Sequence, residues 1–312
     1  MAHAVDEFVG WATRFCLKAV AHAVSVMQYK LKNNGFSLTE VLMAAGILAI
    51  GFAFIAGMFP VGVRLTAIAT EQTIAPIVVD EAIAKIKLYG QIFNASLTEP
   101  NLVDELKKAA SVGNRYVDLV DALPGIPHSD PCEIDEFAYP SAQIKPELKK
   151  YHWSALCGLL GDGNVHVIVF VSRRAGAGVR YLTHDSNWNL PNYGQGVLIS
   201  DRDEWPVPVR VVVNTAGPLP TRTLITPAQE ENYITTGSTI VDDATGQVYR
   251  VLERIYDDVA DEIEIVLDRD WGGPAIGFVW VVPPAVTNPG PPPRVGGRYP
   301  CVRVDPTNTI RF

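Results

Sequence analysis

The sequence predicts an α+β protein in which a long N-terminal transmembrane and stem helix precedes a β-rich globular head with an antiparallel sheet. Residues 41–63 form a run of 23 residues without an ionisable side chain. Apolar residues then recur at helical spacing to about residue 93, and short β-branched runs bounded by turn residues follow from residue 151. We therefore expect a separate N-terminal segment, the helix, the head, and a Pro/Gly-rich segment with a C-terminal strand or tail, over residues 1–35, 36–93, 94–285 and 286–312.

Composition places the chain among folded proteins. Its 312 residues correspond to one or two globular units plus attachments, and 48% hydrophobic with 19% charged residues excludes wholesale disorder. The net charge of -8 disfavours phosphate binding, because affinity for nucleic acid comes from Lys and Arg. We expect no nucleic-acid partner.

The apolar run is long enough to span a membrane. At 1.5 Å per residue, a 23-residue helix reaches about 34 Å, against roughly 30 Å of hydrocarbon. Lys30 and Lys32 lie just upstream, so the positive-inside bias predicts a cytoplasmic N-terminus and an exported head. Hydropathy alone fits equally a signal anchor or an uncleaved signal peptide.

The residues around the start of this run are more specific. A short polar, basic stretch ends at Gly35, Phe36 begins the apolar stretch, and Glu40 is the fifth residue counted from Phe36. This pattern, with its continuation EVLMAAGILAIGF, resembles the N-terminal signal of type IV pilins and pseudopilins, and is most similar to minor pilins. The resemblance covers about thirty residues and hardly extends to the last two thirds of the chain.

The resemblance implies a structural subunit of a type IV pilus or a type II secretion pseudopilus rather than an enzyme. A prepilin peptidase would remove residues 1–35 as a leader by cutting between Gly35 and Phe36, and would methylate the new amine of Phe36. The partners implied are this peptidase, other pilin or pseudopilin subunits, the inner-membrane assembly platform and membrane lipid. The implied location is the bacterial inner membrane, with a periplasmic head, and then the filament.

Glu40 needs a physical explanation. A carboxylate near hydrocarbon costs about 2.5–3.5 kcal/mol on insertion scales unless it has a partner. The family implies that Glu40 pairs with the Phe36 amine of the same or a neighbouring subunit. Alternatively, Glu40 reaches the interface or faces the helix dipole as a first-turn residue, with Ser37 and Thr39 as caps.

The 35-residue leader is longer than is usual in the family, and two explanations remain open. A start at Met27 would leave a nine-residue basic leader. Alternatively, residues 8–26 form an amphipathic helix along the membrane, because apolar residues recur there at spacings of three and four. Downstream, Pro60 deletes a helical hydrogen bond, which predicts a kink or a short melted stretch.

The stem and head are predicted from periodicity. An amphipathic face and a Glu81–Lys85 pair predict that the helix continues beyond the bilayer. A short helix is expected at residues 101–110, a loop at 124–146, and an extended surface segment at 286–297. Strands are expected at residues 151–156, 165–172, 196–199, 207–213, 238–241, 247–254, 262–267, 278–282 and 299–304.

In an exported head, Cys132 and Cys157 would form the most plausible disulfide, and the alternative is that both are small buried hydrophobic residues.

Motifs for catalysis are lacking in the sequence, so we expect no catalytic residue, metal or cofactor. His166 fits a satisfied sheet residue, and His184 with Asp185 fits a turn better than a metal or acid–base site. Five aspartates are expected in solvated turns rather than in a calcium site, namely Asp242, Asp243, Asp257, Asp258 and Asp261. The alternative function is a membrane-anchored periplasmic protein with a β-rich ligand-binding or hydrolytic domain and no filament role.

Overall fold

The structure is a computed structural model, and it divides into two compact units, Met1–Ala67 and Ile68–Phe312. It describes residues 37–95, 102–111, 115–119, 137–142, 145, 148–160, 163–174, 179–182, 206–288, 294–295 and 299–311. One long apolar N-terminal helix and a β-rich C-terminal part with antiparallel sheets are present, as the sequence predicts.

Helix α2 covers Leu38–Ala95 without interruption. Between Leu38 and Leu65 its large apolar side chains are exposed on every side, and Leu48, Phe52 and Ile55 are each more than 60% exposed. A helix that is apolar all round is typical of a membrane span. By length and composition α2 is a candidate single span among the residues that the structure describes.

The helical assignment also continues through Pro60. The expected melted stretch at this proline is therefore wrong, because one missing N–H leaves the flanking hydrogen bonds of a long helix in place. A kink at Pro60 stays a prediction.

Within the second unit, the later part of α2 packs on a five-stranded antiparallel sheet. The sheet has the order β1–β3–β4–β14, and β2 pairs with β3. The strands are β1 (Tyr116–Asp118), β2 (Ala138–Tyr139), β3 (Tyr151–Leu159), β4 (Asn164–Arg173) and β14 (Cys301–Arg311). A short helix, α3 (Leu102–Ser111), contacts β3 and β1. This confirms the helix expected at residues 101–110.

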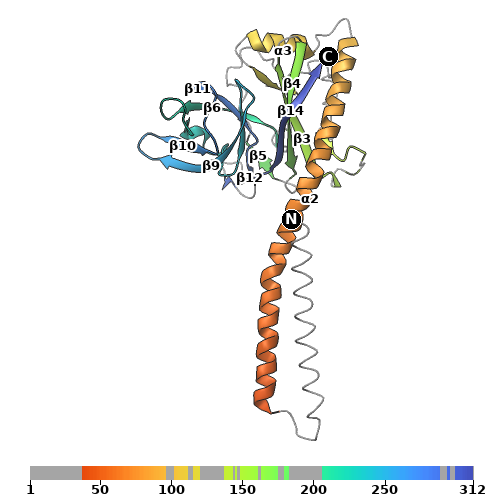
Figure 1. The fold of residues 1–312 in the computed structure, drawn as a ribbon, viewed down its shortest axis with the longest axis vertical. Helices are drawn as coiled ribbons and strands as arrows, with labels where there is room; N and C mark the ends of the chain where they lie inside the picture. The colour runs from red at the N-terminus through yellow and green to blue at the C-terminus, as the bar shows by residue number, and fades with distance from the viewer. Residues whose placement is uncertain are drawn as a thin grey trace. The chain divides into compact units, whose positions relative to one another are not determined.

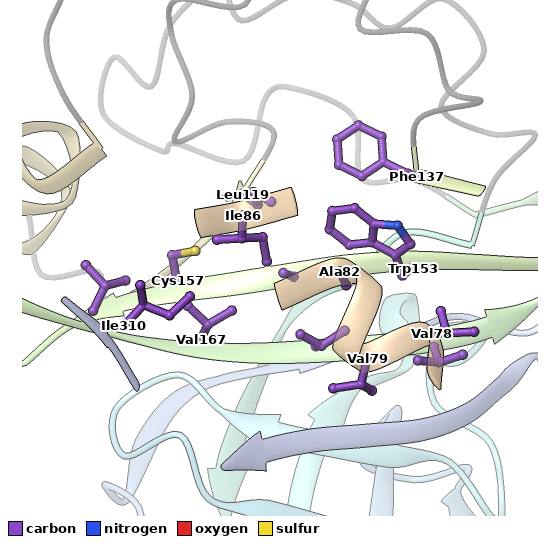
Figure 2. Packing of buried hydrophobic residues seen from close by; sticks show 14 of the residues in the cluster. Val78, Val79, Ala82, Ile86, Leu119, Phe137, Trp153, Cys157, Val167 and Ile310 are labelled. Carbon is purple, nitrogen blue, oxygen red and sulfur yellow. The ribbon is translucent and has the colours of Figure 1, made fainter. Parts of the chain in front are cut away.

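Helical spacing explains how α2 meets the sheet. Ala75, Val78, Ala82 and Ile86 recur at intervals of three and four, and each is at most 1% exposed. They pack with Trp153, which lies on β3, and with alternate residues of β3 and β4 (Figure 2). The predicted amphipathic face is thus confirmed from Ala75 onward, and the Glu81–Lys85 pair is present at 3.3 Å.

The chain between β4 and β14 contributes a closed, six-stranded antiparallel barrel (Figure 1). Its strand order is β10–β7–β6–β11–β8–β9, and β9 closes on β10. The strands are β6 (Val209–Thr215), β7 (Thr223–Pro227), β8 (Thr239–Asp242), β9 (Val248–Asp257), β10 (Glu262–Leu267) and β11 (Ile276–Val281), with a 3-10 turn η5 (Ala228–Glu230). Alternate side chains such as Val211, Ile240 and Ile265 fill the interior and are fully buried.

A small third sheet contains the described residues of the segment 286–297. They are extended, as predicted, but the surface position is wrong for Val286. Strand β12 (Ala285–Asn288) pairs with β5 (Arg180–Tyr181) and with β13 (Arg294–Val295). Val286 is only 1% exposed. The C-terminal strand expected from residue 299 is present, because β14 pairs with β4 over nearly its whole length and buries Ile310.

Candidate membrane anchor and assembly site

The start of α2 has the S-x-x-E sequence of a capping box, and the structure shows the hydrogen bond made by its serine. The Ser37 side-chain Oγ accepts a hydrogen bond from the Glu40 backbone N–H at 3.2 Å, and the Ser37 carbonyl accepts from the same N–H at 3.0 Å. Ser37 precedes the first helical residue, so Glu40 occupies the third helical position of an S-x-x-E box. Ser37 therefore caps the helix, as the sequence suggested.

Glu40 itself is exposed, and it is the acidic residue of the first helical turn. At this position the carboxylate faces the positive end of the helix dipole, which stabilises it by about 0.3–1 kcal/mol. That is less than the 2.5–3.5 kcal/mol cost of a carboxylate near hydrocarbon. The dipole alone leaves most of this cost uncompensated.

Glycines interrupt the apolar surface that follows Glu40. A Cβ placed on Gly46, Gly51, Gly57 or Gly62 would meet no atom within 4 Å. No contact in the described chain therefore requires these glycines. They are open surface where another helix can approach closely.

A partly buried ion pair joins α2 to the head within the second unit. Glu71, 5% exposed, contacts Arg173 at the end of β4, with 3.1 Å between the carboxylate Oε1 and the guanidinium Nη1. Tyr151 lies opposite Arg173 in the β3–β4 register. Burial, and then the Glu71 carboxylate, raise the pKa of Tyr151 above its usual value. The ion pair thus joins the helix to the sheet, with its carboxylate buried and its guanidinium partly exposed to solvent.

On its other face the sheet meets the barrel through a second cluster of buried apolar residues and a polar chain. The Tyr116 hydroxyl lies 2.7 Å from His166 Nδ1, and His166 Nε2 lies 2.5 Å from the Pro306 carbonyl oxygen. A carbonyl can only accept, so Nε2 carries the proton and the Tyr116 hydroxyl donates to Nδ1. His166 is thus a satisfied sheet residue, as predicted.

Tyr116 also touches the barrel itself. A Cβ on Gly246, which lies in the β8–β9 turn, would come within 2.2 Å of the Tyr116 hydroxyl, so only glycine fits there. Burial, followed by the nearby carboxylates of Asp242 and Asp243, raises the pKa of Tyr116 to about 12. The tyrosine therefore stays protonated and keeps donating to His166.

The expectation of solvated turns is wrong for two of the five aspartates. Asp242 is fully buried and accepts from the Thr245 hydroxyl at 2.5 Å. Asp243 is 5% exposed and accepts from Arg210 Nη2 at 2.7 Å and from Trp280 Nε1 at 2.8 Å. Both carboxylates are structural, because a buried charge is tolerated only with such partners.

Two groups of predicted residues remain, those outside the described residues and Cys157. Gly35, Phe36, Cys132, His128, His184 and Asp185 lie outside the described residues. Cys157 is a fully buried thiol in the core between helix and sheet. Because Cys132 lies outside the described residues, the disulfide between them stays a prediction. Burial raises the pKa of the Cys157 thiol, so it behaves as a small hydrophobe. The described part of the chain holds no group of three or more potential metal ligands.

Sequence analysis did not identify the Glu71–Arg173 pair or the Tyr116–His166 contact. The partners are 102 and 50 residues apart, so no local spacing signals either contact. Neither a protein-family model, nor a curated protein, nor a solved structure matches the chain. Its function must therefore be inferred from its own residues and geometry.

Proposed function

We propose that this protein is a minor pilin or pseudopilin, a structural subunit that is inserted in the bacterial inner membrane and assembled through α2 into a type IV pilus or a type II secretion pseudopilus. One observation carries the proposal. A Gly35–Phe36 junction directly precedes a capped helix with one carboxylate, Glu40, in its first turn and exposed apolar side chains all round from there to Leu65.

The charges supply the physical reason. Cleavage between Gly35 and Phe36 frees an amine four residues before Glu40. In hydrocarbon the amine and the carboxylate are each costly alone, and pairing them removes most of that cost. In a bundle of parallel α2 helices, the Glu40 of one copy takes the Phe36 amine of a neighbour. A lone carboxylate thus favours assembly over the separate subunit.

The later part of α2 suits the role of a stem. Its buried face and the Glu71–Arg173 pair hold it on the sheet of the head. The barrel between β4 and β14 adds a module that a simple filament subunit does not need. We therefore place the protein among the specialised rather than the abundant subunits.

Processing of the chain tests the proposal. A C-terminally tagged protein is expressed in its bacterial host, and filaments sheared from the cells are compared with inner membranes by immunoblot. We expect a product in the filaments that has lost its leader up to Gly35 and is shorter than the membrane precursor, and a Gly35→Val variant that stays full length in the membrane. Asn34→Ala, one residue away, is the matched control and should be processed. Processing of Gly35→Val to the normal size would contradict the proposal.

The alternative, an anchored ligand-binding or hydrolytic domain, has less support. The described interior of the barrel is filled by its own side chains, fourteen of which form one buried cluster. Such a packed barrel offers a small molecule no internal site.

A further inference from the structure

Three neighbouring barrel strands share an outer face that mixes carboxylates with apolar side chains. Ile263 and Ile265 of β10 point into the barrel, so the residues that alternate with them point outward. The β9–β10 and β10–β7 registers then define the face. We call this surface the acidic face, and it consists of Glu253, Ile255 and Asp257 on β9, Glu262, Glu264 and Val266 on β10, and Thr223, Ile225 and Pro227 on β7.

The acidic face carries a local electrostatic cost. Asp257 lies directly opposite Glu262, and like charges in that arrangement destabilise a sheet. None of the nine positions is Lys or Arg. Arg254 of β9 is on the opposite side, where it donates to the Glu231 and Ile234 carbonyls and contacts the Glu231 carboxylate.

The barrel as a whole is also acidic. Residues 206–282 contain twelve Asp and Glu against five Arg and no Lys, a net charge of -7 out of -8 for the chain. Local rules are broken in natural proteins mainly where function compensates for the cost. A basic partner would supply that compensation.

The partner must also cover apolar surface. Ile255 on the acidic face is 44% exposed, and Val259 in the β9–β10 turn is 96% exposed. A bare cation would neutralise the carboxylates and leave these side chains in water. A protein surface that combines basic and apolar residues satisfies both.

The same chain offers such a surface at one end of its five-stranded sheet. Lys145 and Lys150 are exposed, and Leu148 between them is 49% exposed. The Arg174 backbone N–H donates to the Lys150 carbonyl, which places the two residues opposite each other on adjoining segments. We call Lys145, Leu148, Lys150 and Arg174 the basic end.

We propose that the acidic face of one copy docks on the basic end of a second copy. In Figure 1 the β9–β10 hairpin projects away from β3 and β4, and the basic end adjoins the start of β3 and the end of β4. A contact between two different surfaces is heterologous, and when its rotation does not close a ring it generates an open, helical array. This docking between two copies rests on the proposed function in one respect only, namely that copies of the protein come together in the membrane or the filament.

Zero-length cross-linking tests the contact. Full-length protein in detergent micelles, prepared as an equal mixture of unlabelled and isotopically heavy chains, is treated with a carbodiimide that joins amines to carboxylates. We expect mixed-isotope peptides linking Lys145 or Lys150 to Asp257 or Glu262. Cross-links confined to single chains, or joining copies only elsewhere, would overturn the proposal.

Charge reversal sharpens the test. Lys150→Glu and Glu262→Lys should each lower the yield between copies about two- to fivefold, the effect of one surface charge pair, and the double variant should restore it. The matched controls are Lys107→Glu on α3 and Asp270→Lys in the barrel, both exposed residues in ion pairs away from the two surfaces. Equal yields from all variants, or no recovery in the double variant, would contradict the docking.

The result is separable from the proposed function. Unprocessed Gly35→Val protein should cross-link as well as the wild type, because neither surface includes the N-terminus. Loss of the cross-link with normal filament incorporation would remove only the docking. A cross-link in a protein that is never processed would instead remove only the pilin role.

Discussion

Two substitutions at the start of α2 separate the charge of Glu40 from its part in the helix cap. Glu40→Gln keeps the cap, because Gln serves as well as Glu at the third helical position and the residue 40 N–H still reaches Ser37. It removes the negative charge. Ser37→Ala does the reverse, since it deletes the capping oxygen and leaves the carboxylate.

The expected magnitudes differ widely. Breaking a buried ion pair by removing one partner costs about 3–5 kcal/mol, and each 1.4 kcal/mol is a factor of ten. Incorporation of Glu40→Gln should therefore fall by about 100-fold or more. Loss of a cap costs about 0.5–2 kcal/mol, so Ser37→Ala should fall by no more than about 30-fold. Insertion of Glu40→Gln should be unimpaired, because removing the charge lowers the cost of entering hydrocarbon.

The assay is the ratio of tagged subunit in sheared filaments to subunit in the inner membrane, measured by quantitative immunoblot beside wild type. The pairing with an amine predicts a normal membrane pool and a nearly empty filament fraction for Glu40→Gln. Wild-type incorporation of Glu40→Gln would refute the reasoning. So would an equal loss in both variants, since Glu40 would then act only through the helix start.

Three further predictions concern the head, each measured by equilibrium denaturation. Ile86→Ala opens a cavity beneath α2 and should lower the free energy of unfolding by about 2–5 kcal/mol, whereas Leu88→Ala, at a side chain 55% exposed, should change it by less than about 1 kcal/mol. Asp243→Ala leaves two buried donors unpaired and should cost about 3–5 kcal/mol, against less than about 1 kcal/mol for the exposed Asp270→Ala. Burial, helped by a nearby arginine, lowers the pKa of His152 to about 3, so its contribution is complete above pH 6.5 and is lost as the pH falls towards 3. A His152→Phe variant should show a shallower acid branch of the stability curve, and an unchanged branch would contradict this assignment.

The spacing of apolar residues predicted those helices and strands whose pattern lies within one continuous stretch of sequence. The strand expected at residues 262–267 is β10, and the alternating apolar run at residues 165–172 lies within β4. The buried positions of α2 follow helical spacing from Ala75 onward. Leu65 lies nearer the apolar span and is 61% exposed, because the span and the amphipathic stem overlap in sequence there.

Pairing between strands that are far apart in the chain could not be predicted from the sequence. The barrel closes only when β10 pairs with β7. Glu264 of β10 and Ile225 of β7 are partners in this pairing, although they are far apart in the sequence. Strand β7 itself was missed because it is short and ends at Pro227. Strand β1 is three residues long, and its Tyr116 is identified as important only by the glycine and the histidine that surround it in space. The burial of Asp242 and Asp243 could not be predicted either, because the sequence around them is typical of an exposed hairpin turn.

The most direct test of the central claim is the intact mass and N-terminal peptide of the protein isolated from membranes of its own host. Our account predicts that the chain begins at Phe36 and that its amine carries one methyl group. A chain that still begins before Gly35, in cells with an active prepilin peptidase, would contradict it.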